Sequence, residues 1–372
     1  MKYLIASKDF NIHIITFSQK FNNKIYEKIR ITKIPLIIHN YNLLGYNIYT
    51  STMFTYRNFI AKEIRRSDIV YISHYWFPAV PLSKKFKKPV LLHVRDNILF
   101  CPLATRYNPI EKKVCTQRNP MRCVKCIYLS EYLRNYPFYI RILSTILKPW
   151  FKLPDSWFKM IDKLIFTSNY QREIITKFFP SLNNKSITIY SLIPHMQYTK
   201  IKGDDFGFLG GNNYFKGFHV LLSAAKKAKL KAACIKIAGT HRGPYIPNVI
   251  YVGRLKHLSK QFYDFYKSIK AVIVPTLMPE PRPYVVTEAL QMGRLLIASK
   301  RGGIQELVQG AKGVMLIDPN PRELLTALNS FSLIDRETAT DLGLHNREYI
   351  LKKFDNSKIV QQFIKVLDDL LN

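Results

Sequence analysis

Two glutamates in the carboxyl-terminal half have the side-chain type and the spacing of a catalytic pair. Glu280 follows the short apolar, β-branched run Ala271–Thr276, and Glu288 lies eight residues later in the helical pattern Val285–Met292. The loop after a parallel strand and the helix that follows it border the same crevice, so both carboxylates could act on one ligand. The alternative is that both are solvated acids without a role.

The surrounding residues are expected to form a β-α-β-α unit. The apolar run Leu295–Ala298 comes shortly after Gly293, which suits the end of a helix, and Gly302-Gly303 then opens another helix. Alternating strands and helices predict a parallel sheet, in which ligands bind beyond the carboxyl ends of the strands. Free backbone N–H groups at Gly302 and Gly303 could hold phosphate there.

Glu280-x7-Glu288, the following Ala-Leu-Gln-Met-Gly run and RGGIQELV with Glu306 resemble the donor-site signature of retaining GT-B glycosyltransferases, specifically glycosyltransferase family 4, the glycosyl transferases of group 1. The resemblance implies an α/β fold with two Rossmann-like doubly wound domains facing across a cleft. It implies that Glu280 lies against the donor sugar as a catalytic residue and that Glu288 bonds the nucleotide ribose. The implied reaction moves a sugar from a nucleotide diphosphate sugar to a hydroxyl of a glycan or lipid-linked acceptor, with retention and without a catalytic metal.

The strand Phe206–Gly210 and the loop GNNYFKG would supply a second part of the donor site. Lys216 lies near a helix start, where positive charge favours phosphate, and it matches the family's lysine for the donor diphosphate. This chain has Gly211 where the family usually has an arginine, so Arg282 or Arg301 would complete the neutralisation. The donor-binding residues implied in this way, with simple turn chemistry as the alternative for the glycine turns, are Gly210, Gly211, Lys216, Gly253, Arg254, Arg282, Glu288, Gly302 and Gly303.

The donor loop also departs from the family pattern. Arg282-Pro283 stands where family members commonly have Phe-Gly. Pro283 has no backbone N–H to donate to a sugar or phosphate oxygen. The identities of the sugar and of the base therefore stay open.

The amino-terminal half has strand patterns of its own and one polar loop. Apolar, β-rich runs predict strands at Met1–Ser7, Ile34–Ile38, Asp68–Ser73, Pro89–Val94 and Asp162–Ser168. His74 and His93 lie at or near strand ends, where a structural role is the alternative to a catalytic one. In HVRDNILFCP, Arg95-Asp96 fills a family motif that usually includes the active-site histidine. Either Arg95 occupies that position or His93 takes the role, and the sequence does not decide between them.

These patterns divide the chain into three parts. Residues 1–195 would form the acceptor-side Rossmann-like domain, which leads into the hinge SLIPHMQYTK. Residues 196–355 would form the domain that binds the nucleotide sugar. The end of the chain predicts two helices joined near Phe354-Asp355, and residues 356–372 would pack back on the first domain.

Four of the five cysteines lie close together in the sequence, at Cys101, Cys115, Cys123 and Cys126. The last two form a Cys-x2-Cys pair, and in a chain without a secretory signal this spacing favours a metal, zinc first, over disulfides. A closed four-thiolate site would have no open position for catalysis, so its role would be to hold the basic loop 101–126 in place. Disulfides and free thiols are the alternatives.

The chain is strongly basic, with a formal charge of +32. Residues 1–200 contain 32 Lys/Arg against 10 Asp/Glu, which is +22 of that total. Such a balance favours phosphate-bearing ligands or an anionic membrane surface. No run reaches the ~18 apolar residues of a spanning helix, and MKYLIASKDF does not have the pattern of a signal peptide. The expected location is the cytoplasm, at the inner face of the membrane.

An aromatic and basic stretch, Tyr136–Trp157, predicts an interfacial helix with Trp150 and Trp157 at headgroup depth. An ordinary helix pair packed on the sheet is the alternative. Two other functions fit a basic α/β chain, a nucleic-acid binder and a GT-B epimerase or phosphorylase. No nucleic-acid recognition motif is present, so no nucleic-acid partner is expected.

Overall fold

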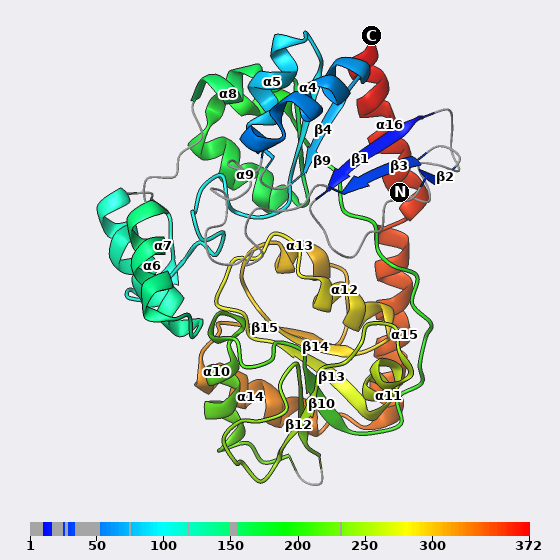
Figure 1. The fold of residues 1–372 in the computed structure, drawn as a ribbon. Coiled ribbons are helices and arrows are strands. Elements are labelled where there is room, and N and C mark those ends of the chain that lie inside the picture. The colour runs from blue at the N-terminus through cyan, green and yellow to red at the C-terminus, as the bar shows by residue number, and fades with distance from the viewer. Residues whose placement is uncertain are drawn as a thin grey trace.

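A computed structural model of the chain describes residues 10–16, 25–26, 29–33, 53–73, 76–117, 119–148, 155–230 and 233–372. The strands predicted at Met1–Ser7 and Ile34–Ile38, together with His74 and Trp150, lie outside the described residues. The described chain forms two α/β domains, one above the other in Figure 1, and helices α15 and α16 run along one side of both. No helix among the described residues is long and apolar enough to cross a membrane.

The carboxyl-terminal domain is built on a parallel sheet in the order β12-β11-β10-β13-β14-β15. Its central strands β13 and β14 are buried along their whole length, which is typical of parallel strands covered on both faces. The strands are β10 Asp205–Phe208, β11 Ile235–Ala238, β12 Val249–Gly253, β13 Ile269–Val274, β14 Leu295–Ser299 and β15 Val314–Ile317.

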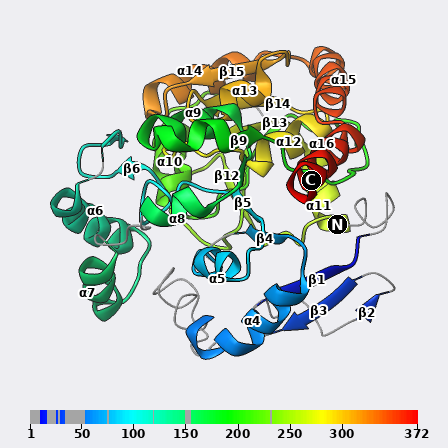
Figure 2. The same cartoon turned by 90° about the horizontal axis from the view of Figure 1, so that it is seen from above.

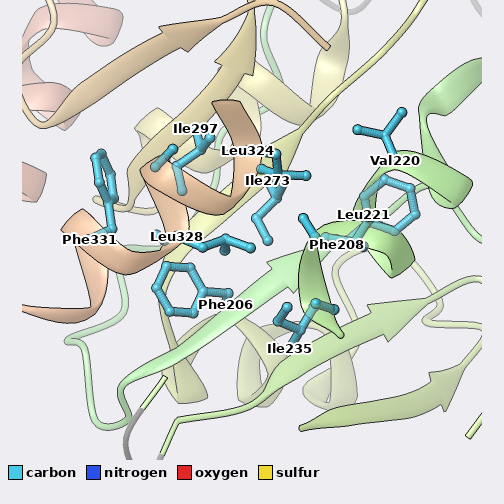
Figure 3. Close-up of a cluster of buried hydrophobic side chains, with 14 of the residues drawn as sticks. Phe206, Phe208, Val220, Leu221, Ile235, Ile273, Ile297, Leu324, Leu328 and Phe331 are labelled. Atoms are coloured by element: carbon cyan, nitrogen blue, oxygen red, sulfur yellow. The ribbon is translucent and has the colours of Figure 1, made fainter. Parts of the chain in front are cut away.

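Helices cover both faces of this sheet. Helices α10 and α14 pack on one face, where Figure 3 shows Phe206, Ile273 and Leu328 in a single apolar cluster. Helices α11, α12 and α15 bury a second cluster on the other face. The helices of this domain are α10 Phe218–Ala225, α11 Lys260–Ser268, α12 Tyr284–Gln291, α13 Ile304–Val308 and α14 Pro321–Ser332.

The amino-terminal domain has a parallel sheet in the order β4-β5-β8-β9. Strands lie within the predicted ranges Asp68–Ser73, Pro89–Val94 and Asp162–Ser168; the second and third contain buried apolar runs, and in the first only Ile72 is buried. A separate sheet pairs β1 with β3 in parallel and β2 with β3 in antiparallel fashion. The strands are β1 Ile12–Thr16, β2 Ile25–Tyr26, β3 Ile29–Lys33, β4 Val70–Ser73, β5 Val90–Val94, β8 Lys163–Phe166 and β9 Ser186–Thr188, and the helices are α4 Arg57–Arg66, α5 Ala79–Lys85, α8 Asp155–Met160 and α9 Asn169–Phe178.

An insertion separates β5 from α8, and its helical part stands apart from this domain (Figures 1 and 2). It contains the short antiparallel pair β6 Tyr107–Asn108 and β7 Lys113–Val114. Two helices follow, α6 Pro120–Leu133 and α7 Phe138–Leu147, which pack against each other.

The last two helices connect the domains. Helix α15, Arg336–Lys353, packs on α12, and α16, Asn356–Leu371, lies beside the amino-terminal domain, where the ring of Phe363 meets that of Tyr71 edge-on at 5.7 Å. The two chain segments that pass between the domains are hydrogen-bonded to each other. The Ile193 N–H donates to the Asn356 Oδ1 at 3.0 Å, and the Asn356 Nδ2 donates to the Ile193 carbonyl at 2.9 Å.

Candidate functional site

The strand order locates a candidate site at the carboxyl ends of β10 and β13. From β10 the chain first adds β11 and β12 on one side and then crosses to β13 on the other, so a crevice forms between β10 and β13. Lys216 follows β10 and Glu280 follows β13. The Lys216 Nζ lies 2.6 Å from the Glu280 Oε2, which places the two expected donor-site residues in direct contact.

Short backbone contacts hold these two side chains together. The Asn213 side chain accepts the N–H groups of Phe215 and Lys216, which forms a 3-10 turn, Tyr214–Lys216. Phe215 is buried, and its carbonyl accepts the Leu277 N–H at 2.9 Å. The loop after β10 is therefore tied to the loop after β13 immediately beside the ion pair.

Glu280 has one oxygen engaged and one open. Its carboxylate is 17% exposed, Oε2 accepts from Lys216, and Oε1 is buried without a hydrogen-bond partner among the described residues. A buried carboxylate oxygen without a donor costs free energy. The open oxygen therefore suits a ligand hydroxyl, which would donate to it.

Gly302 and Gly303 lie directly under the donor loop, and the N–H of Gly303 is used to hold it. The Gly303 N–H donates to the Glu280 carbonyl at 2.9 Å, so it is not available to a phosphate, and the expectation for this N–H is wrong. A Cβ at Gly302 would lie 2.2 Å from the Glu280 carbonyl oxygen, and one at Gly303 would lie 1.9 Å from the Pro281 carbonyl oxygen. Glycine is thus required because the loop backbone passes directly over this turn.

The glycine loops after β10 and β12 also use N–H groups internally. Gly211 donates to the Ala238 carbonyl at 2.9 Å, and Gly253 donates to the Thr240 carbonyl at 2.9 Å. Gly210 lies beside Gly211 at the end of β10, and Arg254 is exposed next to Gly253. The N–H groups of Gly211 and Gly253 are therefore already hydrogen-bonded within the protein and are not free to bind a ligand.

Glu288 is paired with a histidine that the sequence analysis did not identify. The His257 Nε2 lies 3.0 Å from the Glu288 Oε1. Burial raises the pKa of the Glu288 carboxyl, while the charge and hydrogen bond of His257 oppose this rise. His257 lies in the loop between β12 and α11, and its only signal in the sequence is its position after a strand of the predicted domain.

The two candidate arginines lie in different environments. The Arg301 Nη1 donates to the Leu277 carbonyl at 2.8 Å. Arg282 is 7% exposed, its guanidinium lies 4.9 Å from the ring centre of Phe354, and none of its three nitrogens has a hydrogen-bond partner among the described residues. Burial lowers the pKa of Arg282 to about 10.

The polar loop after β5 faces the donor loop through a residue that the sequence analysis missed. The Asn97 Nδ2 donates to the Pro279 carbonyl at 3.2 Å, directly before Glu280. His93 is buried and its Nδ1 lies 2.6 Å from the Tyr71 hydroxyl oxygen. Arg95 is exposed, and the Asp96 Oδ1 accepts the Ile98 N–H at 3.0 Å.

Glu306 makes a second contact between the domains. Its carboxylate accepts the N–H groups of Asn169 and Tyr170 at 3.1 Å each, at the N-terminus of α9, and also the Tyr190 hydroxyl. A carboxylate is favoured there because the first N–H groups of a helix lack internal partners and carry positive partial charge. The two domains are therefore in contact across the cleft in this structure.

The four clustered cysteines are free thiols. Burial raises the pKa of Cys126 to about 12, and the neighbouring Cys101, Cys123 and Cys115 contribute to the rise. Within the described ranges no three His, Cys, Asp or Glu side chains are grouped to hold a metal ion. The arrangement does not fit a zinc site as it stands, so no role is assigned to a metal.

The insertion that carries these cysteines reaches the donor domain. The ring of Tyr107 meets that of Phe215 edge-on at 6.3 Å, and the Arg134 guanidinium lies 5.3 Å from the centre of the same ring. Phe215 directly precedes Lys216. Two parts of the insertion, β6 and the turn after α6, therefore lie beside the candidate site.

Comparison with known proteins finds a family model that matches part of the carboxyl-terminal domain. Residues 203–332 match the family model "Glycosyl transferases group 1". The chain is 25% identical over 181 residues to an O-antigen chain mannosyltransferase C of Escherichia coli, covering 45% of this chain and 48% of the relative. It is 29% identical over 104 residues to a lipopolysaccharide 1,2-N-acetylglucosaminetransferase of Salmonella typhimurium, covering 28% and 27%. The chain thus spans about half or less of the length of these relatives.

Solved structures extend the likeness to the whole fold. A sucrose-phosphate synthase of Thermosynechococcus elongatus has a TM-score of 0.66 at 14% identity, covering 99% of this chain and 91% of that protein. The HepE protein of Anabaena, in complex with UDP and glucose, has a TM-score of 0.59 at 14% identity, covering 92% and 86%. The chain is therefore related to the glycosyl transferases of group 1 through its carboxyl-terminal domain and has the GT-B fold.

Proposed function

We propose that this protein transfers a sugar, with retention, from a nucleotide diphosphate sugar to an acceptor hydroxyl. The observation that carries the proposal is the Lys216–Glu280 pair at the point where the strand order of the donor sheet reverses. A cation for the diphosphate and a carboxylate with one open oxygen for the sugar lie there side by side. The match of residues 203–332 to a glycosyltransferase family supports the same assignment.

Each donor-side residue has a role that its surroundings favour. Lys216, beside the N-terminus of α10, would neutralise the charge that develops on the departing diphosphate. Glu280 would accept a hydroxyl of the donor sugar through its open oxygen. Glu288 would accept the ribose hydroxyls, with His257 fixing the orientation of its carboxylate.

The acceptor would enter from the amino-terminal domain. The loop after β5 contacts the donor loop through Asn97, so a hydroxyl held by that loop would lie near the donor sugar. His93, Arg95 and Asp96 stay in this proposal as acceptor-side residues. Retention requires the acceptor oxygen to bond the sugar carbon on the face from which the diphosphate leaves.

The relatives indicate the class of donor and acceptor. HepE is described in complex with UDP-glucose, which supports a nucleotide diphosphate sugar as donor. The named activities of two curated relatives concern O-antigen and lipopolysaccharide. We therefore propose a glycan or lipid-linked acceptor of a cell-surface polysaccharide for this chain.

A donor screen tests the function directly. The purified protein is incubated with a panel of nucleotide diphosphate sugars, and release of nucleotide is measured with and without added acceptor. Glu280→Ala should lower turnover more than binding, and Glu288→Ala should weaken binding. Glu348→Gln, an exposed acid on α15 outside the site, is the matched control and should change neither. No turnover of any donor, or equal kinetics in all three variants, would contradict the assignment.

A further inference from the structure

Helix α7 presents its apolar side chains to solvent. Only Ile140 and Ser144 in this helix are buried. Elsewhere on the same helix, the side chain of Tyr139 is 68% exposed and that of Ile146 is 59% exposed. The large apolar residues of α7 that are exposed in this way are Phe138, Tyr139, Ile142, Leu143, Ile146 and Leu147. An exposed apolar patch of this kind marks a surface that binds something.

A buried ion pair holds helix α7, which carries this surface, against helix α6. Glu131 on α6 is fully buried, and its Oε1 accepts from the Lys148 Nζ at 2.6 Å, directly after α7. The Arg134 Nη1 lies 3.5 Å from the same oxygen. A buried ion pair thus fixes α7 against α6 while the apolar side chains of α7 remain outside.

The charge around the patch selects the kind of partner. Residues 120–148 contain five Arg or Lys, and their one acid is the buried Glu131. The Arg141 guanidinium lies within 5.5 Å of the ring centres of Tyr128, Tyr132 and Phe138, so cationic and aromatic groups share one surface. A second copy of the chain would bring two basic surfaces together, whereas an anionic bilayer matches both the charge and the apolar groups.

We propose that the α6–α7 hairpin docks on an anionic lipid bilayer. Helix α7 would lie in the plane of the headgroups with its exposed side chains in the acyl boundary, and the basic residues of α6 would face lipid phosphates. The proposal deepens the proposed function, on which it rests for its purpose, because Arg134, in the turn between α6 and α7, contacts Phe215 beside Lys216. A lipid-linked acceptor in that bilayer would lie close to the donor site.

The exposed surface is only part of the stretch Tyr136–Trp157 that the sequence indicated. Trp157 was expected at headgroup depth, but it lies half-buried on α8 and packs against the core of the amino-terminal domain. The exposed apolar groups come ten or more residues earlier, on α7. The hairpin projects from the body of the molecule in both views, so it can reach a flat surface (Figures 1 and 2).

Vesicle co-sedimentation of the full chain tests the proposal. Vesicles of phosphatidylcholine alone are compared with vesicles that also contain phosphatidylglycerol. The hairpin variant replaces three exposed side chains, Tyr139→Ser, Ile142→Ser and Ile146→Ser. The matched control removes three exposed apolar side chains of the carboxyl-terminal domain, Tyr245→Ser, Leu258→Ser and Leu333→Ser.

The wild type and the control should bind the anionic vesicles, with binding that falls as salt rises. The hairpin variant should bind the anionic vesicles at least about tenfold more weakly than the wild type. Its melting temperature should be unchanged, because the altered side chains are exposed. Replacing the exposed Arg122 and Lys125 by Gln should weaken binding further. Equal binding by the hairpin variant and the wild type would overturn the proposal, as would no binding of the wild type to either vesicle.

Two further measurements separate the alternatives. Donor turnover without lipid is measured on the same preparations, and it should be equal in the wild type and the hairpin variant. Donor turnover without vesicle binding would refute the docking surface and support the proposed function. Vesicle binding without turnover of any donor would support the docking surface and contradict the proposed function. A wild-type dimer in solution that the hairpin substitutions abolish would assign the surface to a second copy and refute the membrane.

Discussion

Arg282→Met should make the unliganded protein more stable. The wild-type guanidinium is buried with no hydrogen-bond partner and no paired acid among the described residues. Burial lowers the pKa of Arg282 from 12.5 to about 10. At about 1.4 kcal/mol per pH unit, this difference corresponds to a destabilisation of about 3 kcal/mol. It is fully present at neutral pH, where Arg282 is charged in both the folded and the unfolded chain, and is relieved as pH rises through the folded pKa.

Methionine keeps an apolar stem over Phe354 and removes the charge. We expect the free energy of unfolding to rise by about 1–3 kcal/mol, because apolar replacements of buried charges are commonly neutral or stabilising. Urea unfolding of the unliganded protein, followed by circular dichroism, measures the change in midpoint. Arg301→Met is the matched control, and it should not stabilise, because Arg301 is partly exposed and donates to the Leu277 carbonyl.

The affinity for the donor should change in the opposite direction. A buried cation without a partner, two residues after Glu280 in the donor loop, suits an anionic group of the nucleotide sugar, so Arg282→Met should weaken binding of the donor found in the screen. The reasoning would be refuted if the unliganded variant lost several kcal/mol of stability. Such a loss would mean that the guanidinium has a protein partner.

Four further predictions concern the donor site and the contact between the domains. Because the pKa of Glu288 is raised, nucleotide affinity should fall on acidification at a pH above the ordinary glutamate value of 4.5, and a binding titration of Glu288→Gln should lack this dependence. His257→Ala should move the pH dependence of the wild type to higher pH, because it removes the group that lowers the pKa of Glu288. Glu306→Gln should weaken domain contact by about 1–3 kcal/mol, seen as a larger radius of gyration in solution scattering; an unchanged radius would show that other contacts hold the domains. Gly303→Ala should lower turnover, since its Cβ would lie 1.9 Å from the Pro281 carbonyl oxygen; full activity would show that the donor loop can move aside.

The sequence predicted the central strands of the donor domain well because they are buried on both faces. Ala271–Thr276 and Leu295–Ala298 correspond to β13 and β14 within two residues, since uninterrupted apolar runs between turn residues leave few alternatives. Lys216 and Glu280 come together as the family motif implies. The strand pattern of the carboxyl-terminal domain and the motif were enough to assign Lys216 and Glu280 to the donor site.

The partners of those residues could not be predicted in the same way. His257 meets Glu288 across 31 positions and Asn97 meets Pro279 across 182, and contacts at such separations depend on how whole elements pack. The N–H of Gly303 is occupied because the donor loop folds back over it, which a glycine count does not reveal. The expected interfacial stretch Tyr136–Trp157 contains both the exposed helix α7 and the half-buried Trp157, and the sequence did not separate them because large aromatic residues suit a core and an interface equally. Elemental analysis remains the test of the zinc expectation for Cys101–Cys126.

The hydrogen bonds between Ile193 and Asn356 limit how the two domains can move. Both chain segments that join the domains pass through one point, and the pair of bonds prevents one segment from sliding along the other. A rotation of one domain against the other about an axis through that point would leave both bonds intact. Such a rotation separates the surfaces farthest from the axis most, so opening acts on the contacts across the cleft, at Glu306 and Asn97, while the axis itself stays intact. The free energy of closure is then set where the donor binds, and a bound donor can alter the balance between open and closed forms without any change at the axis.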